Sequence, residues 1–267
     1  MQEPTFVDVG GIELATWEYG SGDPFLLVHG YTGSSLDWSD VVENLATKHR
    51  VITVDQRGHG RSTKTSDEGS YSLARLVSDL TQLVDKLGLS SFHLLGHSMG
   101  GMVAMRYALE APQRLRSLIL MDTAAEPLRG APQMMRLGIE LAKTQGLDAV
   151  YDAVSPFLGN TPRAEQIRQR MRTKFGQMDV AAFVALGEQL LEHESVLDRL
   201  ATLRVPTTIL LGENDHGLRA GSEALATTIP GNVFTVIPNT GHSPQEDDPA
   251  AWLAAVAGHF DRLAAAS

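Results

Sequence analysis

The feature that most constrains this chain is an alternation between short, continuously apolar runs and longer segments with helical spacing. The apolar runs lie at residues 25–28, 51–54, 92–95 and 118–121. Strands that lack polar alternation are buried on both faces, which is typical of a parallel sheet covered by helices. The alternation therefore predicts an α/β fold with helices on both faces of the sheet.

Further elements are expected on either side of this region. Two β-branched and aromatic runs open the chain, and the Gly10-Gly11 pair between them suits a hairpin turn with positive φ. The expected strands of the opening and closing regions are 5–9, 12–17, 207–211 and 233–237. The expected helices are 36–48, 73–87, 98–110 and 249–263.

The strand pattern stops between about residues 125 and 200. Apolar residues there recur at helical spacing, as at Met134, Leu137 and Leu141, and glycines and prolines divide the stretch into about four helices. We interpret residues 125–200 as a helical cap inserted into an α/β core made of 1–124 and 201–267. The alternative, an independent helical domain, lacks a Gly/Ser-rich or charged linker at its borders.

Composition limits the class of partner. The chain has 267 residues, with 22 basic against 32 acidic side chains and a net charge of -10. This charge repels phosphates, so we expect a small-molecule substrate and neither nucleic acid nor a membrane surface as partner. The absence of cysteine excludes a thiolate nucleophile. The start of the chain lacks a secretion signal, so we expect a cytoplasmic protein. We expect it to be a monomer or a homodimer.

Gly96-His97-Ser98-Met99-Gly100 stands between an apolar run and a helix-forming run. A strand that turns sharply into a helix around a strained serine needs small residues two before and two after that serine. The turn exposes the hydroxyl near the positive end of the helix, where developing negative charge is stabilised. We therefore predict Ser98 as a nucleophile, against the alternative that it only caps the helix.

The loop Val28-His29-Gly30-Tyr31-Thr32 follows the first buried run. Acyl transfer needs two donors aimed at the developing oxyanion, and we assign them to the backbone N–H groups of Tyr31 and Met99. Gly30 leaves room for a substrate to approach the backbone. For His29, a hydrogen bond to the loop backbone is the simpler explanation.

The general base is predicted to be His242, which lies in a turn-rich loop directly after the last strand. A carboxylate is needed to fix the imidazole tautomer, and Asp215 follows the preceding strand by a short loop. The order serine, aspartate, histidine agrees with this assignment. Asp122 and Glu213 are the alternative acids. His97 flanks the serine but is expected to point elsewhere.

The run from Asp55 to Ser62 contains no nucleophile with a base of its own, so we interpret it as a loop that braces the cap side of the site. The chain lacks a phosphate loop, a His-Glu-x-x-His metal helix and a complete dinucleotide fingerprint. No cofactor and no metal are therefore implied.

These motifs together resemble the α/β-hydrolase superfamily, and in particular its capped bacterial members. His29-Gly30, Asp55 to Ser62 and Gly96 to Gly101 carry the likeness, which covers nearly the whole chain. The resemblance implies an eight-stranded, mostly parallel sheet with an antiparallel second strand and a helical cap after the sixth strand. Serine at position 98 departs from the similar epoxide hydrolases and haloalkane dehalogenases, which carry aspartate there.

The expected activity is hydrolysis of carboxylic esters with small to medium, mainly apolar groups, through an acyl enzyme. Carbon-carbon bond hydrolysis, enol-lactone hydrolysis, perhydrolysis and a ligand receptor on the same fold remain alternatives. Carbon-carbon hydrolysis of a keto acid would need a cation in the pocket, for which the candidates are Arg129, Arg136 and Arg163. The expected substrate contacts are His29, Gly30, Met134, Leu137, Phe157 and Phe183, within a wider apolar set that includes Met135, Met171 and Phe175.

Overall fold

A computed structural model of the chain describes residues 3–128, 132–158 and 162–266, and one sheet runs through this part of the molecule. Its eight strands lie in the order β1-β2-β4-β3-β5-β6-β7-β8. β2 is antiparallel to β1 and β4, and the other neighbours are parallel. The strands are β1 Thr5–Asp8, β2 Glu13–Tyr19, β3 Asp23–Val28, β4 His49–Val54, β5 Phe92–His97, β6 Leu115–Met121, β7 Thr207–Gly212 and β8 Val233–Ile237.

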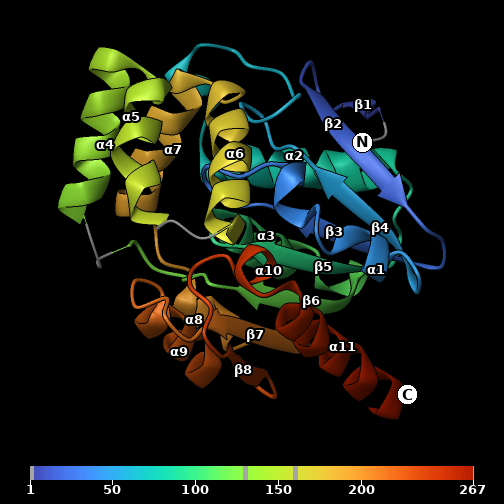
Figure 1. Cartoon of the computed structure of the whole chain (residues 1–267). Helices are drawn as coiled ribbons and strands as arrows, with labels where there is room; N and C mark the ends of the chain where they lie inside the picture. The colour runs from blue at the N-terminus through green and yellow to red at the C-terminus, as the bar shows by residue number, and fades with distance from the viewer. Residues whose placement is uncertain (1–2, 129–131, 159–161, 267) are drawn as a thin grey trace.

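Helices connect the strands and cover both faces of the sheet (Figure 1). The α-helices of the described residues are α1 Val42–Leu45, α2 Leu73–Lys86, α3 Met99–Glu110, α4 Pro132–Gln145, α5 Leu147–Val154, α6 Pro162–Gly176, α7 Val180–Glu192, α8 Leu197–Leu200, α9 Arg219–Thr228, α10 Pro244–Asp247 and α11 Pro249–Ala266. Short 3-10 turns are η1 Ser35–Trp38, η2 Glu68–Ser70, η3 Pro112–Arg114 and η4 Ser155–Leu158. The predicted α/β-hydrolase fold class, with its antiparallel second strand, is confirmed.

The core consists of two apolar layers, one on each face of the sheet. Along β3, Phe25 and Leu27 pack toward Trp252 of α11, whereas Leu26 and Val28 pack toward α2 and α3. The alternation follows from the two-residue period of a strand. Because burial of each large apolar side chain stabilises a fold by about 1.5–3 kcal/mol, these two layers hold the strand ends in place.

Local sequence signals explain where α2 begins and ends. The Ser72 hydroxyl accepts a hydrogen bond from the N–H of Arg75 at 3.2 Å, as an N-cap residue does. Leu76, Leu80 and Leu83 form its buried face. Gly88, with a φ of 65°, follows the helix in the left-handed region that favours glycine. The observed span agrees with the predicted 73–87.

The helices differ from the prediction in two places. The helix expected at 36–48 is divided into η1 and α1, because the Ser39 hydroxyl donates to the carbonyl of Leu36 at 2.7 Å at the end of η1. The helix α9 was not predicted. Its sequence is rich in glycine, serine, alanine and threonine, and only Ser222 and Leu225 of its side chains are buried, so its apolar periodicity is weak.

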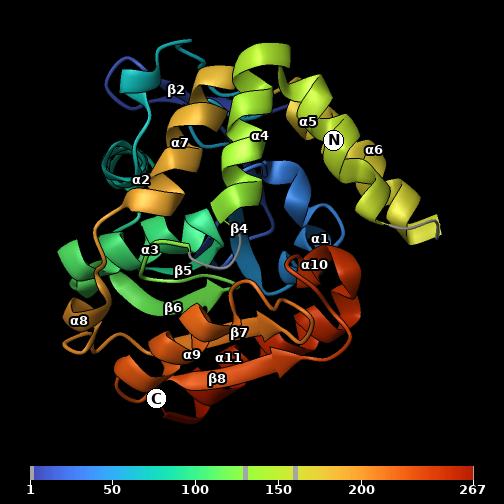
Figure 2. The ribbon, with the colours of Figure 1, turned by 90° about the vertical axis from the view of Figure 1, so that its left-hand side faces the viewer.

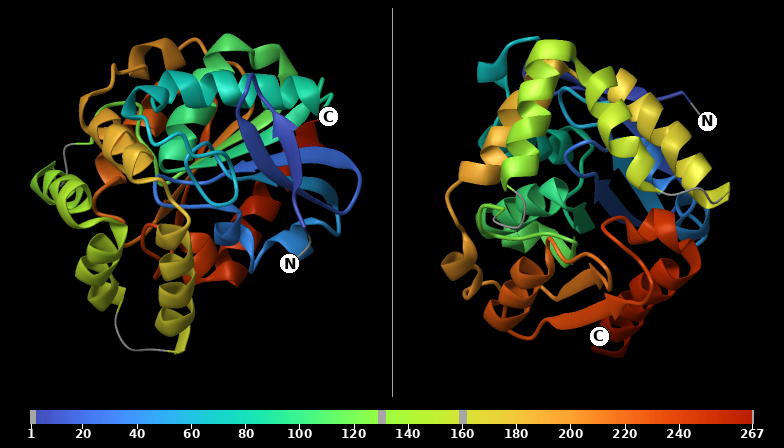
Figure 3. Two further views of the ribbon diagram at one scale, coloured as in Figure 1. Left: turned by 90° about the horizontal axis from the view of Figure 1, so that it is seen from above. Right: turned by 60° about the vertical axis from the view of Figure 1, so that its left-hand side comes forward.

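The helices α4 to α7 lie between β6 and β7 in the chain, within the range 125–200 that we interpret as a cap, and are called the cap below. Figure 2 shows α4 and α7 above α3, and Figure 3 shows the same group of helices from two further directions. The cap therefore stands over the loops at one end of the sheet. No helix within the described ranges has both the length and the apolar character needed to cross a membrane.

Candidate active site

Ser98 stands at the turn from β5 into α3, in a strained backbone conformation. Its φ and ψ are 53° and -120°, which a non-glycine residue rarely adopts. A Cβ at Gly96 would lie 2.3 Å from the carbonyl oxygen of Gly100, and a Cβ at Gly100 would lie 2.3 Å from that of Val28. Glycine is therefore required on both sides of the serine, as the sequence motif predicts.

The structure brings Ser98, His242 and Asp215 into one hydrogen-bonded chain. His242 Nε2 lies 3.1 Å from Ser98 Oγ, and His242 Nδ1 lies 2.7 Å from Asp215 Oδ2. Since an ionised carboxylate can only accept, Nδ1 carries the ring proton and Nε2 is free to accept the serine proton. The imidazole side chain is 45% exposed and the Asp215 side chain only 7%.

The charge of Asp215 is stabilised by its partners. Burial acts to raise the pKa of this carboxyl, but the hydrogen bond and charge of His242 and the N–H of Leu218 outweigh burial, so the pKa lies below its ordinary value. Asp215 is consequently ionised at neutral pH and can stabilise a positively charged imidazole.

The loop after β3 forms the other side of the site. Gly30 lies against the serine, since a Cβ there would be 3.1 Å from Ser98 Cβ. Met99 is the first residue of α3, where N–H groups have no partner within the helix. The carbonyl of Tyr31 accepts a hydrogen bond from the ring of His59 at 2.6 Å. The hydroxyl of Tyr31 donates to the carbonyl of Phe183 in the cap. These contacts hold the loop between core and cap.

A pocket of about 330 Å³ adjoins Ser98 and is lined by residues of the core and the cap. Its apolar wall comes from Leu128, Met135, Leu190 and Leu218. Sequence reasoning missed three of these four, and it included Met135 only in the wider apolar set. A larger surface cleft of about 670 Å³ between α2, α3 and α7 contains no residue of the Ser98 site.

Of the six expected substrate contacts, only Gly30 lines this pocket; the other five, His29, Met134, Leu137, Phe157 and Phe183, do not. Met134, Leu137 and Phe157 are 62%, 62% and 83% exposed. On α4, Met135 faces the pocket, and Met134 is turned away because successive residues of a helix are rotated by about 100°. Phe183 is buried, with its ring 4.9 Å from the ring of Tyr31, so it supports the loop rather than lining the pocket.

His29 and His97 lie beneath the site as buried, neutral side chains. His29 Nε2 accepts from the N–H of Gln56 at 3.0 Å, and His29 Nδ1 lies 2.7 Å from the carbonyl of Gly30. His29 therefore braces the loop through hydrogen bonds to its backbone, as expected from the sequence. His97 Nε2 donates to the carbonyl of His242 at 2.6 Å, a contact that the sequence did not reveal. Burial, followed by the charge of a neighbouring histidine, lowers the pKa of His29 to about 3 and that of His97 to about 4.

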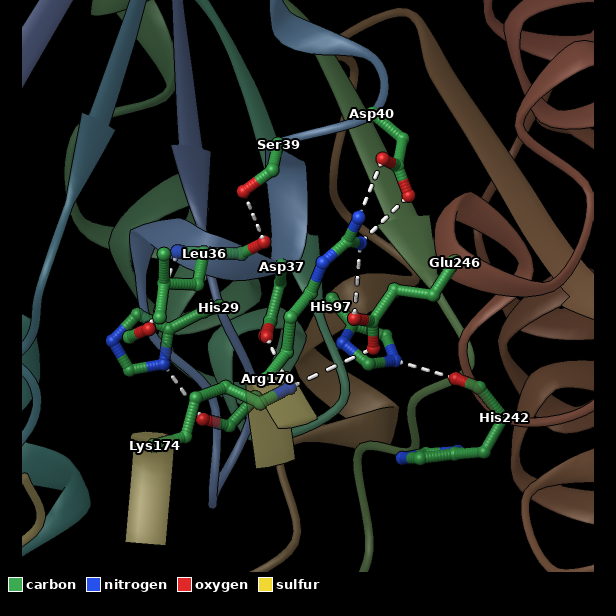
Figure 4. A network of polar contacts seen from close by, with 12 residues as sticks. His29, Leu36, Asp37, Ser39, Asp40, His97, Arg170, Lys174, His242 and Glu246 are labelled. Atoms are coloured by element: carbon green, nitrogen blue, oxygen red, sulfur yellow. Dashed lines mark hydrogen bonds and ion pairs between the residues drawn. The ribbon is translucent and has the colours of Figure 1, made fainter. Parts of the chain in front are cut away.

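An ionic cluster, which is buried at Lys174, Asp37 and Glu246 and open to solvent at Asp40, ties α6 to the loops around the site (Figure 4). Lys174 Nζ lies 2.6 Å from Asp37 Oδ1 and 3.6 Å from Glu246 Oε2. Arg170 binds Asp40 with an N–O distance of 2.6 Å. Asp37 and Asp40 follow the Tyr31 loop, and Glu246 follows His242, so one cap helix contacts both of the loops that form the site.

The electrostatic balance of this cluster is uneven. Burial acts to raise the pKa of Asp37, but the charge of Lys174 outweighs burial and lowers that pKa overall. For Glu246, burial dominates the opposing charge of Lys174 and raises the pKa. Lys174 and Asp37 therefore form the ionised pair at the base of the pocket.

Asp122, the alternative acid, lies directly behind Asp215. Its side chain is fully buried, and its Oδ1 accepts from the N–H of Gly212 at 2.8 Å. Ligand atoms of Asp122, Asp215 and His242 lie within 4.8 Å of one another, which is the geometry of a possible metal site. Two ligands on one zinc ion would lie about 3.3 Å apart, whereas His242 Nδ1 and Asp215 Oδ2 are 2.7 Å apart and hydrogen-bonded. The group is thus better suited to proton transfer than to metal binding.

The run from Asp55 to Ser62 braces the loops, in line with its interpretation. The carboxylate of Asp55 accepts from the N–H groups of Ser35 at 2.6 Å and Arg61 at 2.8 Å. The carbonyl of Gly58 accepts from the N–H of Asp179, the N-cap of α7, at 2.8 Å. This loop therefore joins the core to the start of a cap helix.

Comparison with known proteins identifies the family. The family model described as alpha/beta hydrolase fold matches residues 23–249. The chain belongs to the α/β-hydrolase family. This α/β hydrolase is 33% identical over 217 residues to the putative carbamate hydrolase RutD of Azorhizobium caulinodans, covering 77% of this chain and 78% of that protein.

Solved structures give the same result. A thermophilic esterase from Thermogutta terrifontis is 30% identical to this α/β hydrolase, with a TM-score of 0.83 and 98% of each chain covered. An enol-lactonase from Burkholderia xenovorans LB400 has a TM-score of 0.86 over 96% of this chain and 100% of its own. At 22% identity the latter likeness shows the fold alone.

Proposed function

We propose that this α/β hydrolase is a serine carboxylesterase with Ser98 as nucleophile, His242 as general base and Asp215 as the acid that orients the base. The observation that carries the proposal is the continuous hydrogen-bonded chain from Asp215 through His242 to Ser98, with distances of 2.7 Å and 3.1 Å. Nucleophile, base and orienting group are thereby in reach of one another.

The reaction proceeds in two steps. Ser98 Oγ bonds to the ester carbonyl carbon while His242 Nε2 takes its proton, and the same imidazole then protonates the departing alkoxide. A water molecule next attacks the acyl enzyme, giving its proton to His242, and the acid leaves as Ser98 recovers its proton. The N–H groups of Tyr31 and Met99 are the proposed donors to the oxyanion.

The polar groups of the pocket favour a neutral ester over a keto acid. Of the three candidate cations for a keto acid, Arg136 binds Glu192 on the surface. Arg163 donates to the carbonyl of Glu246. Arg129 lies outside the described residues. Lys174 lines the pocket, but Asp37 neutralises it. The acyl or alcohol group would instead contact the apolar wall that contains Met135 and Leu190.

The test combines covalent labelling with turnover. A fluorophosphonate should add once to the wild-type protein, as seen by intact mass, and p-nitrophenyl esters of graded chain length should be hydrolysed. In Ser98→Ala, the adduct should disappear and kcat/KM should fall by at least about 10⁴-fold. Ser91→Ala, at an exposed serine just before β5, serves as the matched control.

Either of two results would remove the assignment: labelling that persists in Ser98→Ala, or unchanged turnover of that variant. A single labelling event without turnover would instead favour the ligand-receptor alternative. Enol-lactones and carbon-carbon substrates, assayed in parallel, distinguish the hydrolytic alternatives from one another.

A further inference from the structure

Asp122 is a buried acid that the proposed reaction does not use, and its position is unusual. It follows the last residue of β6 with a φ of 45°, in the left-handed region, and its side chain is 0% exposed. Its Oδ1 is held by the N–H of Gly212, at the carboxyl end of β7, at 2.8 Å. The backbone of two adjacent strands thus fixes this carboxyl beside Asp215.

The second oxygen of Asp122 faces acids rather than donors. Among the described residues, no N–H or O–H group donates to Asp122 Oδ2. The titratable groups around it are Asp215 on the loop after β7, His242 on the loop after β8 and Asp247 of α10. Asp247 in turn accepts from the N–H of Gly241 at 2.7 Å.

Two carboxyl groups this close and this buried do not both ionise, because the second charge would be neither solvated nor paired. Asp215 is the member stabilised as an anion, since it accepts from His242 Nδ1 at 2.7 Å and from the N–H of Leu218 at 3.2 Å. Asp122 accepts only one backbone hydrogen bond among the described residues. The proton therefore belongs on Asp122.

We propose that Asp122 is a neutral carboxylic acid at physiological pH that donates a hydrogen bond to Asp215 and acts as a positioning residue for the Asp215–His242–Ser98 chain. Its effect on the rate rests on the proposed function, whereas its protonation does not. Burial, together with the charge of Asp215, raises the pKa of Asp122 well above its ordinary value, in agreement with this role.

A donor behind Asp215 has two consequences. It fixes the rotamer that presents Asp215 Oδ2 to His242 Nδ1, so the imidazole is held in line with Ser98. It also gives the buried Asp122 Oδ2 a hydrogen-bond partner, which that oxygen otherwise lacks among the described residues; a buried polar atom without a partner is costly in a region closed to water.

The protonation state is tested by stability rather than by activity. An acid whose pKa is raised in the folded state destabilises that state increasingly as pH rises from the unfolded pKa toward the folded pKa. Asp122→Asn keeps the size, the donor and a residue type tolerant of positive φ, but carries no proton to lose. Its melting temperature, relative to wild type, should therefore rise by roughly 3 °C or more between about pH 4 and about pH 8.

Asp148→Asn, at an exposed aspartate of α5, is the control and should show no such trend. A pH-independent difference between Asp122→Asn and wild type would mean that Asp122 is ionised in the folded protein, and would overturn the proposal. This result does not depend on any substrate, so it is distinct from a failure of the esterase assignment.

The positioning role is tested by comparing two variants on the best p-nitrophenyl ester. Asp122→Asn retains a donor to Asp215 and should keep kcat within about threefold of wild type. Asp122→Gly accepts the positive φ without strain but removes the donor, and kcat should fall about tenfold or more with KM little changed. Equal losses in both variants, or a loss in KM alone, would contradict a role through Asp215.

Discussion

Replacement of Lys174 by methionine removes a buried charge from the contact between cap and core with little change in side-chain length. The side chains of Lys174 and Asp37 are only 8% and 4% exposed, and their charged atoms lie 2.6 Å apart. In Lys174→Met, Asp37 would remain buried without its cation, next to neutral histidines. We expect Asp37 to take up a proton in the folded variant.

The free energy needed to protonate Asp37 sets the expected loss of stability in Lys174→Met. With an ordinary aspartate pKa of about 3.9 in the unfolded chain and 1.36 kcal/mol per pKa unit, a neutral Asp37 costs about 4 kcal/mol at about pH 7. The same arithmetic gives about 1.5 kcal/mol at about pH 5. Loss of one partner of a buried ion pair typically costs about 3–5 kcal/mol, in agreement with the first figure.

In the wild-type protein, ionised Asp37 stabilises the fold, whereas in Lys174→Met the neutral Asp37 destabilises it. Lys174 lowers the pKa of Asp37 in the folded state, so this pair stabilises the fold above the unfolded pKa of the aspartate. That contribution is lost only as pH falls through the lowered pKa. Wild type and Lys174→Met should therefore differ most at neutral pH and converge on acidification.

Urea unfolding, followed by the fluorescence of the buried Trp38 and Trp252, measures the difference at the two pH values. Lys143→Met removes an exposed cap lysine whose ion pair with Glu188 is solvated, and it should change little. Lys174→Met combined with Asp37→Asn should recover most of the loss. A loss in Lys174→Met that is small, or equal at both pH values, would refute the reasoning.

Two further predictions concern the pocket and the turn at Ser98. Met135→Ala should shift the preference among p-nitrophenyl esters toward longer chains, because Met135 lines the pocket, whereas Met134→Ala, at a side chain 62% exposed, should not; equal effects would place the substrate elsewhere. Gly100→Ala should destabilise the fold by several kcal/mol in urea unfolding, because its Cβ would lie 2.3 Å from the Val28 carbonyl oxygen. A stable and active Gly100→Ala protein would show that the turn tolerates a side chain.

The sequence by itself determined the fold class, and it supplied the proposed positions of the candidate site residues along the chain. Continuous apolar runs and helical periodicity are local properties, so they predict strands and helices without knowledge of their packing. The turn at Ser98 is local only in part, because the Gly100 carbonyl requires a glycine at position 96, whereas the carbonyl of Val28 on the neighbouring strand β3 requires a glycine at position 100. The placement of Asp215 and His242 after successive strands followed from the rule that parallel strands present their carboxyl ends at one edge.

Only the tertiary structure decided which side chains surround that edge. The apolar residues of the cap are alike in sequence, and the rotation of α4 alone separates Met135 in the pocket from Met134 in solvent. Lys174 and Asp37 are 137 residues apart in the chain, yet they form one buried pair. The adjacency of Asp122 and Asp215 likewise arises from the pairing of β6 with β7. Such contacts depend on how whole elements pack, and no short stretch of sequence encodes that packing.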